Sequence, residues 1–231
     1  GAESRRAALE AVRNRADFIK PADRWILSAL HHTVGAVRES LSAYKFNDAA
    51  HALYQFVWHQ FCDWYLEETK PRLAAGSEEE RRFVRALLIE VLDSVVRLLH
   101  PIMPFITEEI WSQLPRHADD PDLLMLAAFP SRDERFLDDK AEEGMEEFIQ
   151  AITRILNIKG ENNIHPAKKI RLMVRKFDGR RSRSGWEVFE AESEFFHAAT
   201  NIQAISYLDD GQPHPAVSAT DATSMGEWIV P

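Results

Sequence analysis

The sequence predicts a mainly α-helical protein, a helical bundle followed by a small α/β appendage at the C-terminus. Apolar residues recur every three or four positions through the first two thirds of the 231 residues, the spacing of helices with one buried face. After Pro166, runs of β-branched and aromatic residues between turn residues take over. The composition is 45% hydrophobic, which excludes intrinsic disorder.

The first long predicted helix spans residues 23–44. Its apolar residues form one stripe along the helix: Leu27, Leu30, Val34, Val37, Leu41 and Tyr44. Asn47 or Asp48 can cap the next helix by accepting hydrogen bonds from its free backbone N–H groups. Pro71 is expected to end that helix, because proline has no N–H and clashes with the preceding turn.

A third helix is predicted from the capping box of Ser77 and Glu80 to about His100. Its apolar positions cover more than a narrow stripe, so we expect burial on two sides. A shorter helix follows over residues 105–114. The acidic, aperiodic stretch 115–139 is interpreted as mostly loop.

The remaining elements alternate in type. They are a helix over 140–160, a strand over 170–177, a helix over 186–199, and strands over 202–208 and 228–230. The change in character places a domain boundary near residue 164. The predicted domains are therefore a helical bundle over 1–164 and an α/β appendage over 165–231.

Ten large residues are expected to form the core of the bundle, because they lie on the apolar faces of the predicted helices. They are Trp25, Phe56, Trp58, Phe61, Trp64, Leu92, Leu99, Phe105, Ile110 and Trp111.

The charge balance is acidic, with 28 Lys and Arg against 37 Asp and Glu, a net charge of −9. Such a balance argues weakly against a nucleic-acid partner, although local basic clusters decide the matter more than the sum does, and no DNA partner is expected. A single cysteine, Cys62, cannot form an internal disulfide. No apolar run reaches the roughly 18 residues that cross a bilayer, so we expect a cytoplasmic protein with no membrane partner.

No catalytic or metal site is predicted. The sequence has no G-x-S-x-G nucleophile turn, no P-loop and no G-x-G-x-x-G loop. The neighbours His31 and His32 diverge by about 100° on a helix and cannot easily share a metal ion. His51 and His59 are about two helical turns apart, which is too far to share a metal ion. The chain is therefore predicted to act by recognition and not by chemistry of its own.

Several phrases resemble the anticodon-binding domain of class I aminoacyl-tRNA synthetases, and in particular its valyl group. They include Asp-Arg-Trp-Ile-Leu-Ser (23–28), Tyr-Lys-Phe-Asn-Asp-Ala-Ala (44–50) and Phe-Cys-Asp-Trp-Tyr-Leu-Glu (61–67). Two more are Leu-His-Pro-Ile-Met-Pro-Phe-Ile-Thr-Glu-Glu-Ile-Trp (99–111) and His-Pro-Ala-Lys-Lys (165–169). The resemblance covers residues 23–171 well and 172–231 loosely. The helix over 5–18 departs from the family pattern.

The resemblance implies a piece of a longer ligase that binds the anticodon stem and loop of tRNA(Val), as a monomer. The family's H-I-G-H-like and K-M-S-K-S-like catalytic phrases are missing, so a catalytic domain in cis is expected to activate valine with ATP and Mg²⁺. No cofactor is expected in this piece, and the piece alone should be inactive.

RNA-binding residues are proposed from this resemblance and from charge, because Lys and Arg hold phosphates. Lys168 and Lys169 fall on the family motif at 165–169, and Lys70 falls on a further one, Lys-Pro-Arg-Leu at 70–73; the other residues rest on charge and proximity. The full set is Arg13, Arg15, Arg24, Lys70, Arg72, Lys168, Lys169 and Arg171.

Two alternatives stay open. One is the same domain from an isoleucyl or leucyl synthetase, against which the Cys62–Tyr65 phrase argues. The other is a helical protein-interaction module that descends from a synthetase and has no RNA role. The altered helix over 5–18 and the acidic balance are its support.

Overall fold

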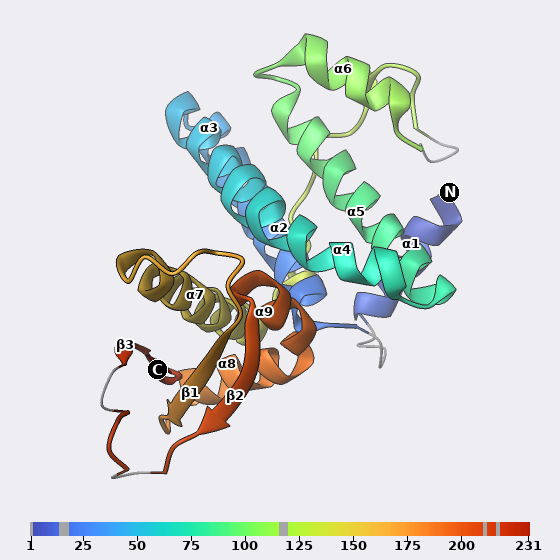
Figure 1. Ribbon diagram of the computed structural model, residues 1–231. Coiled ribbons are helices and arrows are strands. Elements are labelled where there is room, and N and C mark those ends of the chain that lie inside the picture. The colour runs from blue at the N-terminus through green and yellow to red at the C-terminus, as the bar shows by residue number, and fades with distance from the viewer. Residues whose placement is uncertain (1, 14–18, 116–119, 210–211, 216–217) are drawn as a thin grey trace. The chain divides into compact units, whose positions relative to one another are not determined.

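The computed structural model describes residues 2–13, 19–115, 120–209, 212–215 and 218–231. The chain divides into two compact units, Gly1–Asp138 and Asp139–Pro231. The first unit is helical and the second combines helices with a sheet, as Figure 1 shows. The predicted class, mainly α with a small α/β part at the C-terminus, is confirmed.

The first unit is built from helices joined by short turns. They are α1 (Ala2–Arg13), α2 (Pro21–Ser42), α3 (Phe46–Tyr54), the π-helix η1 (Gln55–Tyr65), α4 (Leu66–Ala75), α5 (Glu78–Leu99), α6 (Pro104–Gln113) and the 3₁₀ turns η2 (Leu124–Leu126) and η3 (Glu134–Phe136). The predicted stripe of α2 is buried at Leu27, Leu30, Val34 and Val37. Ser77 caps α5 by accepting from the Glu80 N–H, as predicted.

The π-helix η1 explains why one predicted core residue is wrong. Its buried residues Phe56, Phe61 and Tyr65 are five and four positions apart, a wider spacing than the 3.6 residues of an α-helical turn. The wider turns bring these three rings onto one face. Trp58 lies on another face and is 55% exposed.

Pro71 does not end its helix, contrary to the prediction, because α4 continues to Ala75 with the proline inside it. The next residue, Arg72, forms ion pairs with Asp23 of α2 and Glu80 of α5. These tertiary contacts stabilise the turn that the proline weakens.

Helix α6 packs against α5 through one face only. Trp111 and Thr107 are buried there, and Trp111 joins Val96 and Leu124 in a small core. Phe105, a predicted core residue at the start of α6, is instead 91% exposed. The prediction for Phe105 is wrong because an α-helix turns about 200° between Phe105 and the buried Thr107, so Phe105 lies on a side of α6 that is open to solvent.

The second unit packs helices against a four-stranded sheet of order β2-β1-β4-β3. Its elements are α7 (Asp139–Glu161), β1 (Ile170–Lys176), α8 (Arg180–Ala191), α9 (Ser193–Thr200), β2 (Ile202–Tyr207), β3 (Ala219–Thr223) and β4 (Gly226–Val230). Strand β1 pairs parallel with β2 and antiparallel with β4. The predicted helix over 186–199 is two helices, α8 and α9, and β3 was not predicted.

The unit boundary lies between residues 138 and 139, not near residue 164, so α7 belongs with the sheet. Two glycines explain this arrangement. A Cβ on Gly144 of α7 would lie 2.8 Å from the Ser184 oxygen of α8, and one on Gly185 of α8 would lie 2.9 Å from the Glu147 Cβ of α7. The two helices therefore cross too closely for residues larger than glycine at these positions. The sequence pattern of neither helix predicts this contact.

His31 links α2 to the segment before η3. Its Nδ1 accepts from the Asp133 N–H at 3.2 Å, and its ring stacks on Phe136 with centroids 4.9 Å apart. The pKa of His31 is lowered from 6.5 to about 4, mainly by burial; Asp133 partly opposes this effect, and Arg132 and His32 add to the lowering. The folded state therefore holds a neutral imidazole.

We expect acid to destabilise the first unit through His31. The unfolded state binds a proton below about pH 6.5 and the folded state only below about pH 4, so stability falls as the pH drops through this window. The loss amounts to as much as about 3 kcal/mol. His31→Gln, which can still accept from Asp133, should remove this part of the dependence in urea titrations at pH 7 and 4.5. Equal pH dependence in both proteins would contradict the assignment.

Candidate nucleic-acid interface

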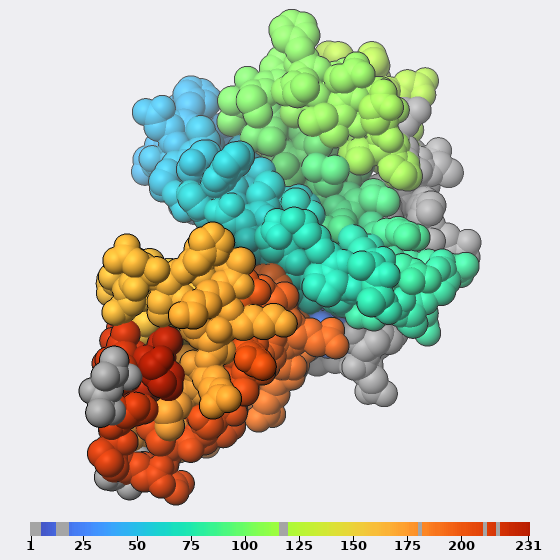
Figure 2. All heavy atoms as spheres, viewed as in Figure 1, coloured from blue at the N-terminus to red at the C-terminus, as the bar shows by residue number. Residues whose placement is uncertain are grey.

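Two pairs of exposed aromatic residues lie along α3 and the segments that flank it, and we call the four residues the aromatic face. They are Tyr44, Phe46, Tyr54 and Trp58, each at least 54% exposed. The rings of Tyr54 and Trp58 are parallel, with an interplanar angle of 4° and centroids 6.4 Å apart. Figure 2 shows α3 and η1, in blue to cyan, at the surface of this unit. Parallel planar rings open to solvent are the kind of platform on which unpaired bases stack.

The aromatic face continues into polar side chains that can read base edges. Asn47, His51, Tyr54 and Trp58 are four, three and four positions apart and all exposed, so they line one side of the helix. Lys45 is exposed at the start of α3. The search for basic residues missed this stripe, although its helical spacing is visible in the sequence.

The predicted basic residues of the first unit are less available than expected. The Arg24 Nε lies 3.2 Å from an Asp138 oxygen, and its side chain is 25% exposed. Lys70 is well exposed and forms an ion pair with Glu67 one turn earlier. Arg15 and the side chain of Arg13 lie outside the described residues.

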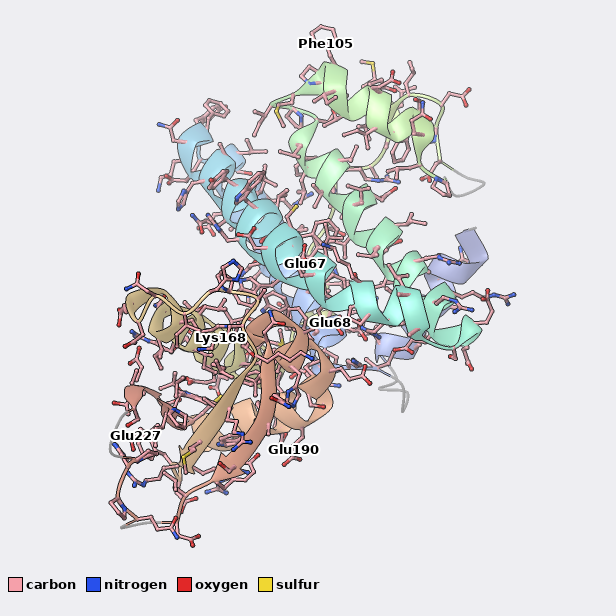
Figure 3. All side chains as sticks on the ribbon, in the orientation of Figure 1. Glu67, Glu68, Phe105, Lys168, Glu190 and Glu227 are labelled. Carbon is pink, nitrogen blue, oxygen red and sulfur yellow. The ribbon has the colours of Figure 1, made fainter. Side chains whose placement is uncertain are left out.

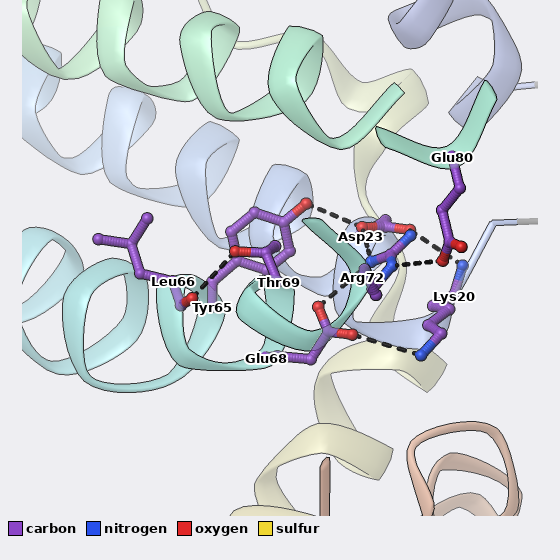
Figure 4. Close-up of polar contacts among 8 residues, drawn as sticks. All are labelled: Lys20, Asp23, Tyr65, Leu66, Glu68, Thr69, Arg72 and Glu80. Atoms are coloured by element: carbon purple, nitrogen blue, oxygen red, sulfur yellow. Dashed lines mark hydrogen bonds and ion pairs between the residues drawn. The ribbon is translucent and has the colours of Figure 1, made fainter. Parts of the chain in front are cut away.

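Arg72 corrects the prediction, because it is buried and cannot reach a phosphate. Its guanidinium forms two 2.9 Å hydrogen bonds with the Asp23 carboxylate, one of 3.2 Å with Glu68 and one of 3.0 Å with Glu80. Figure 4 shows this buried ion network, to which Lys20 and the Tyr65 hydroxyl are also joined. Only 4% of Arg72 is exposed.

The protonation states in the buried ion network depend on burial and on the neighbouring charges. Burial alone lowers the pKa of the Arg72 guanidinium, but the Asp23 carboxylate outweighs it and the net pKa is raised. Burial raises the pKa of Tyr65, whose neutral hydroxyl donates to Asp23 at 2.8 Å. The network therefore joins α2, α4 and α5 and acts in folding rather than in binding.

In the second unit, the predicted residues Lys168, Lys169 and Arg171 are all exposed. Within the described part of the chain, none of the three forms an ion pair. Lys168 and Lys169 lie in the turn between α7 and β1, which we call the basic turn (residues 165–169), and Figure 3 labels Lys168. Two adjacent free ammonium groups are suited to the phosphates of a nucleic-acid backbone.

A buried lysine that the sequence did not single out holds the basic turn. The Lys159 ammonium donates to the carbonyl oxygens of Pro166 at 2.7 Å, Lys168 at 3.1 Å and Thr200 at 3.1 Å. Lys159 is 2% exposed, and burial lowers its pKa. Its three contacts join the end of α7, the basic turn and the end of α9.

Two further basic residues, both on β1, are engaged within the unit. Arg175 pairs with Glu227 of β4 at 2.7 Å. The Lys176 ammonium lies over the rings of Trp186 and Tyr207, 4.2 and 4.7 Å from their centroids. Lys168, Lys169 and Arg171 are therefore more available to a ligand than these two residues.

The described residues form neither a metal site of three ligands nor a membrane-spanning helix. No three His, Cys, Asp or Glu side chains within them are placed to hold a metal ion. None of the helices they form is both long and apolar enough to cross a membrane.

Comparison with known proteins identifies the family of the chain. A family model described as the anticodon-binding domain of tRNA ligase matches residues 23–174, which include the aromatic face and the basic turn. The valine–tRNA ligase of Thermotoga maritima is 34% identical over 200 residues, which cover 87% of this chain and 21% of that protein. The chain thus spans about a fifth of the length of this relative.

Proposed function

Because the chain belongs to the family of anticodon-binding domains of tRNA ligases, we propose that it binds the anticodon stem and loop of tRNA(Val) as part of a valine–tRNA ligase. The observation that carries the proposal is the exposed parallel pair Tyr54 and Trp58 within the residues that the family model matches. The name of the Thermotoga relative supports the valine specificity.

The two units contribute different kinds of contact in this proposal. In the first unit, unstacked anticodon bases lie on Tyr54 and Trp58, and Asn47 and His51 of the same stripe donate to or accept from base edges. In the second unit, Lys168, Lys169 and Arg171 hold backbone phosphates. Base contacts specify the RNA, and phosphate contacts position it.

The ligation itself is assigned to the part of such an enzyme that lies outside this chain, in the cytoplasm where tRNA is charged. The ATP and Mg²⁺ consumed in aminoacylation belong to that part. In this proposal the chain positions the tRNA, acts as a monomer and is inactive alone.

We expect Trp58→Ala to weaken the binding of tRNA(Val) about tenfold, because stacking on one aromatic ring contributes about 1–3 kcal/mol per base. Since Trp58 is exposed, the free energy of unfolding should change little. The measurement is a fluorescence titration with tRNA(Val), and with the same tRNA carrying a changed middle anticodon base, at 50 and 200 mM salt. The base change should also weaken binding by the unaltered chain.

Two variants control this test. Trp58→Phe keeps a planar ring and should retain most of the affinity. Phe105→Ala removes a ring that is 91% exposed on a different helix and should leave RNA binding unchanged. If Trp58→Ala binds as tightly as the unaltered chain, the aromatic face is not the base-binding surface.

A further inference from the structure

A second exposed apolar surface lies on α6 and differs in charge from the aromatic face. Figure 2 shows α6, in light green, open to solvent, and Figure 3 shows Phe105 pointing away from its helix. Beside it, Leu123 and Met125 of the η2 segment are 48% and 68% exposed. Exposed apolar groups gathered in one place mark surfaces that bind other molecules.

These residues line an open groove of about 570 Å³ between α6 and the segment before η2, which we call the α6 groove. Its walls are Pro104, Phe105, Leu123 and Met125. The groove is held in shape by its own hydrogen bonds. The Glu108 carboxylate accepts from the Leu124 N–H at 2.9 and 3.2 Å, and His100 lies 2.8 Å from the Thr107 hydroxyl.

The α6 groove is negatively charged. Among the described residues that line it are the carboxylates Glu108, Glu109 and Asp122, and no lysine or arginine. Carboxylates repel phosphates, so RNA does not fit here. A second copy of the chain does not fit either, because a two-fold contact would bring the carboxylates of both grooves together.

The chemistry that does fit is a polypeptide segment with Lys or Arg beside apolar residues. The methylene stem of such a residue packs on Phe105 and Met125, while its cation meets Glu109 or Asp122. A ligase of the length of the Thermotoga relative has about four fifths of its residues outside this chain. Residues tethered to the same chain bind at a high effective concentration, so even a modest contact is occupied.

We infer that the α6 groove docks a basic, partly apolar segment of the same polypeptide, from outside residues 1–231. The inference rests on the proposal that the chain is part of a longer ligase, but it does not depend on anticodon binding. The contact anchors α6, and with it α5, to another part of the enzyme.

The test places a photo-reactive side chain in the full-length protein by substituting Phe105→p-benzoylphenylalanine. The exposed ring makes this change compatible with folding. Illumination should give a cross-link within one polypeptide, to a peptide outside residues 1–231 that contains Lys or Arg. Adding Glu109→Lys should lower the cross-link yield at least about fivefold, because a charge pair of about 1 kcal/mol becomes a repulsion. Glu79→Lys, at an exposed position on α5, is the matched control and should leave the cross-link yield unchanged.

The same probe at Tyr44, on the aromatic face, separates this inference from the proposed function. Tyr44→p-benzoylphenylalanine should cross-link to tRNA and not to the remaining polypeptide. At Phe105, a cross-link to tRNA, to a second copy or to a different protein would overturn the inference, as would the absence of any cross-link. A peptide without Lys or Arg, or a yield insensitive to Glu109→Lys, would overturn the charge argument.

Discussion

Replacing Arg72 with methionine is expected to destabilise the first unit by about 3–5 kcal/mol, because it leaves the buried carboxylate of Asp23 without its cation and leaves Glu68 with Lys20 alone. Asp23 is fully buried and Glu68 is 2% exposed, so water cannot replace the guanidinium. Urea unfolding followed by tryptophan fluorescence measures the loss. The free energy of unfolding of Arg72→Lys should lie between those of the unaltered chain and Arg72→Met, since lysine keeps the charge but not the paired geometry with Asp23.

The matched control is Arg82→Met, which removes an exposed arginine paired with Glu78 and should change stability little. Asp23→Asn in the Arg72→Met background should recover part of the loss, because it removes an unpaired buried charge. The dependence of RNA affinity on salt counts phosphate contacts and should be the same for Arg72→Lys and the unaltered chain. An Arg72→Met protein as stable as Arg82→Met would contradict the role of the buried ion network.

Replacing Lys159 with methionine is expected to destabilise the second unit by about 3 kcal/mol and to weaken RNA binding at the basic turn. The change removes three hydrogen bonds from a charged donor to the carbonyls of Pro166, Lys168 and Thr200. Without them, Lys168 and Lys169 lose their fixed position. The slope of log affinity against log salt should fall by about 1 for each lost phosphate contact.

Lys140→Met is the matched control, because Lys140 lies on the same helix and its side chain is 63% exposed. It should change neither stability nor the salt slope. Lys168→Ala with Lys169→Ala should lower the salt slope without lowering stability, since both side chains are exposed. If Lys159→Met lowers stability but leaves the slope unchanged at a temperature where it is folded, Lys159 supports the fold and does not position the turn.

Local patterns predicted the parts of the fold that local forces determine. The stripe along α2, the Ser77 cap of α5 and the strand character of β1 and β2 follow from spacing and capping chemistry, and all are present. The family resemblance located the domain, and the family model matches residues 23–174. Exposed charge at Lys168 and Lys169 was also predicted from sequence.

The errors share one physical cause, which is that burial depends on neighbours distant in sequence. Trp58 was expected inside because it is large and apolar, but the π-helical turns of η1 bury Phe56, Phe61 and Tyr65 instead. Phe105 was expected inside, but it lies on a side of α6 that is open to solvent. The domain boundary was misplaced because the crossing of α7 and α8 at Gly144 and Gly185 has no local signature.

The fold class, most helix positions and the family follow from the sequence, because periodicity, capping and family motifs are encoded within short segments. Which charged and aromatic residues are available to a ligand depends on tertiary packing. Arg72 and Lys159 are enclosed by carboxylates and carbonyls from other elements, whereas Trp58 and Phe105 are left outside. The sequence gives the type of each side chain, but the exposure of that side chain to solvent depends on which residues pack over it.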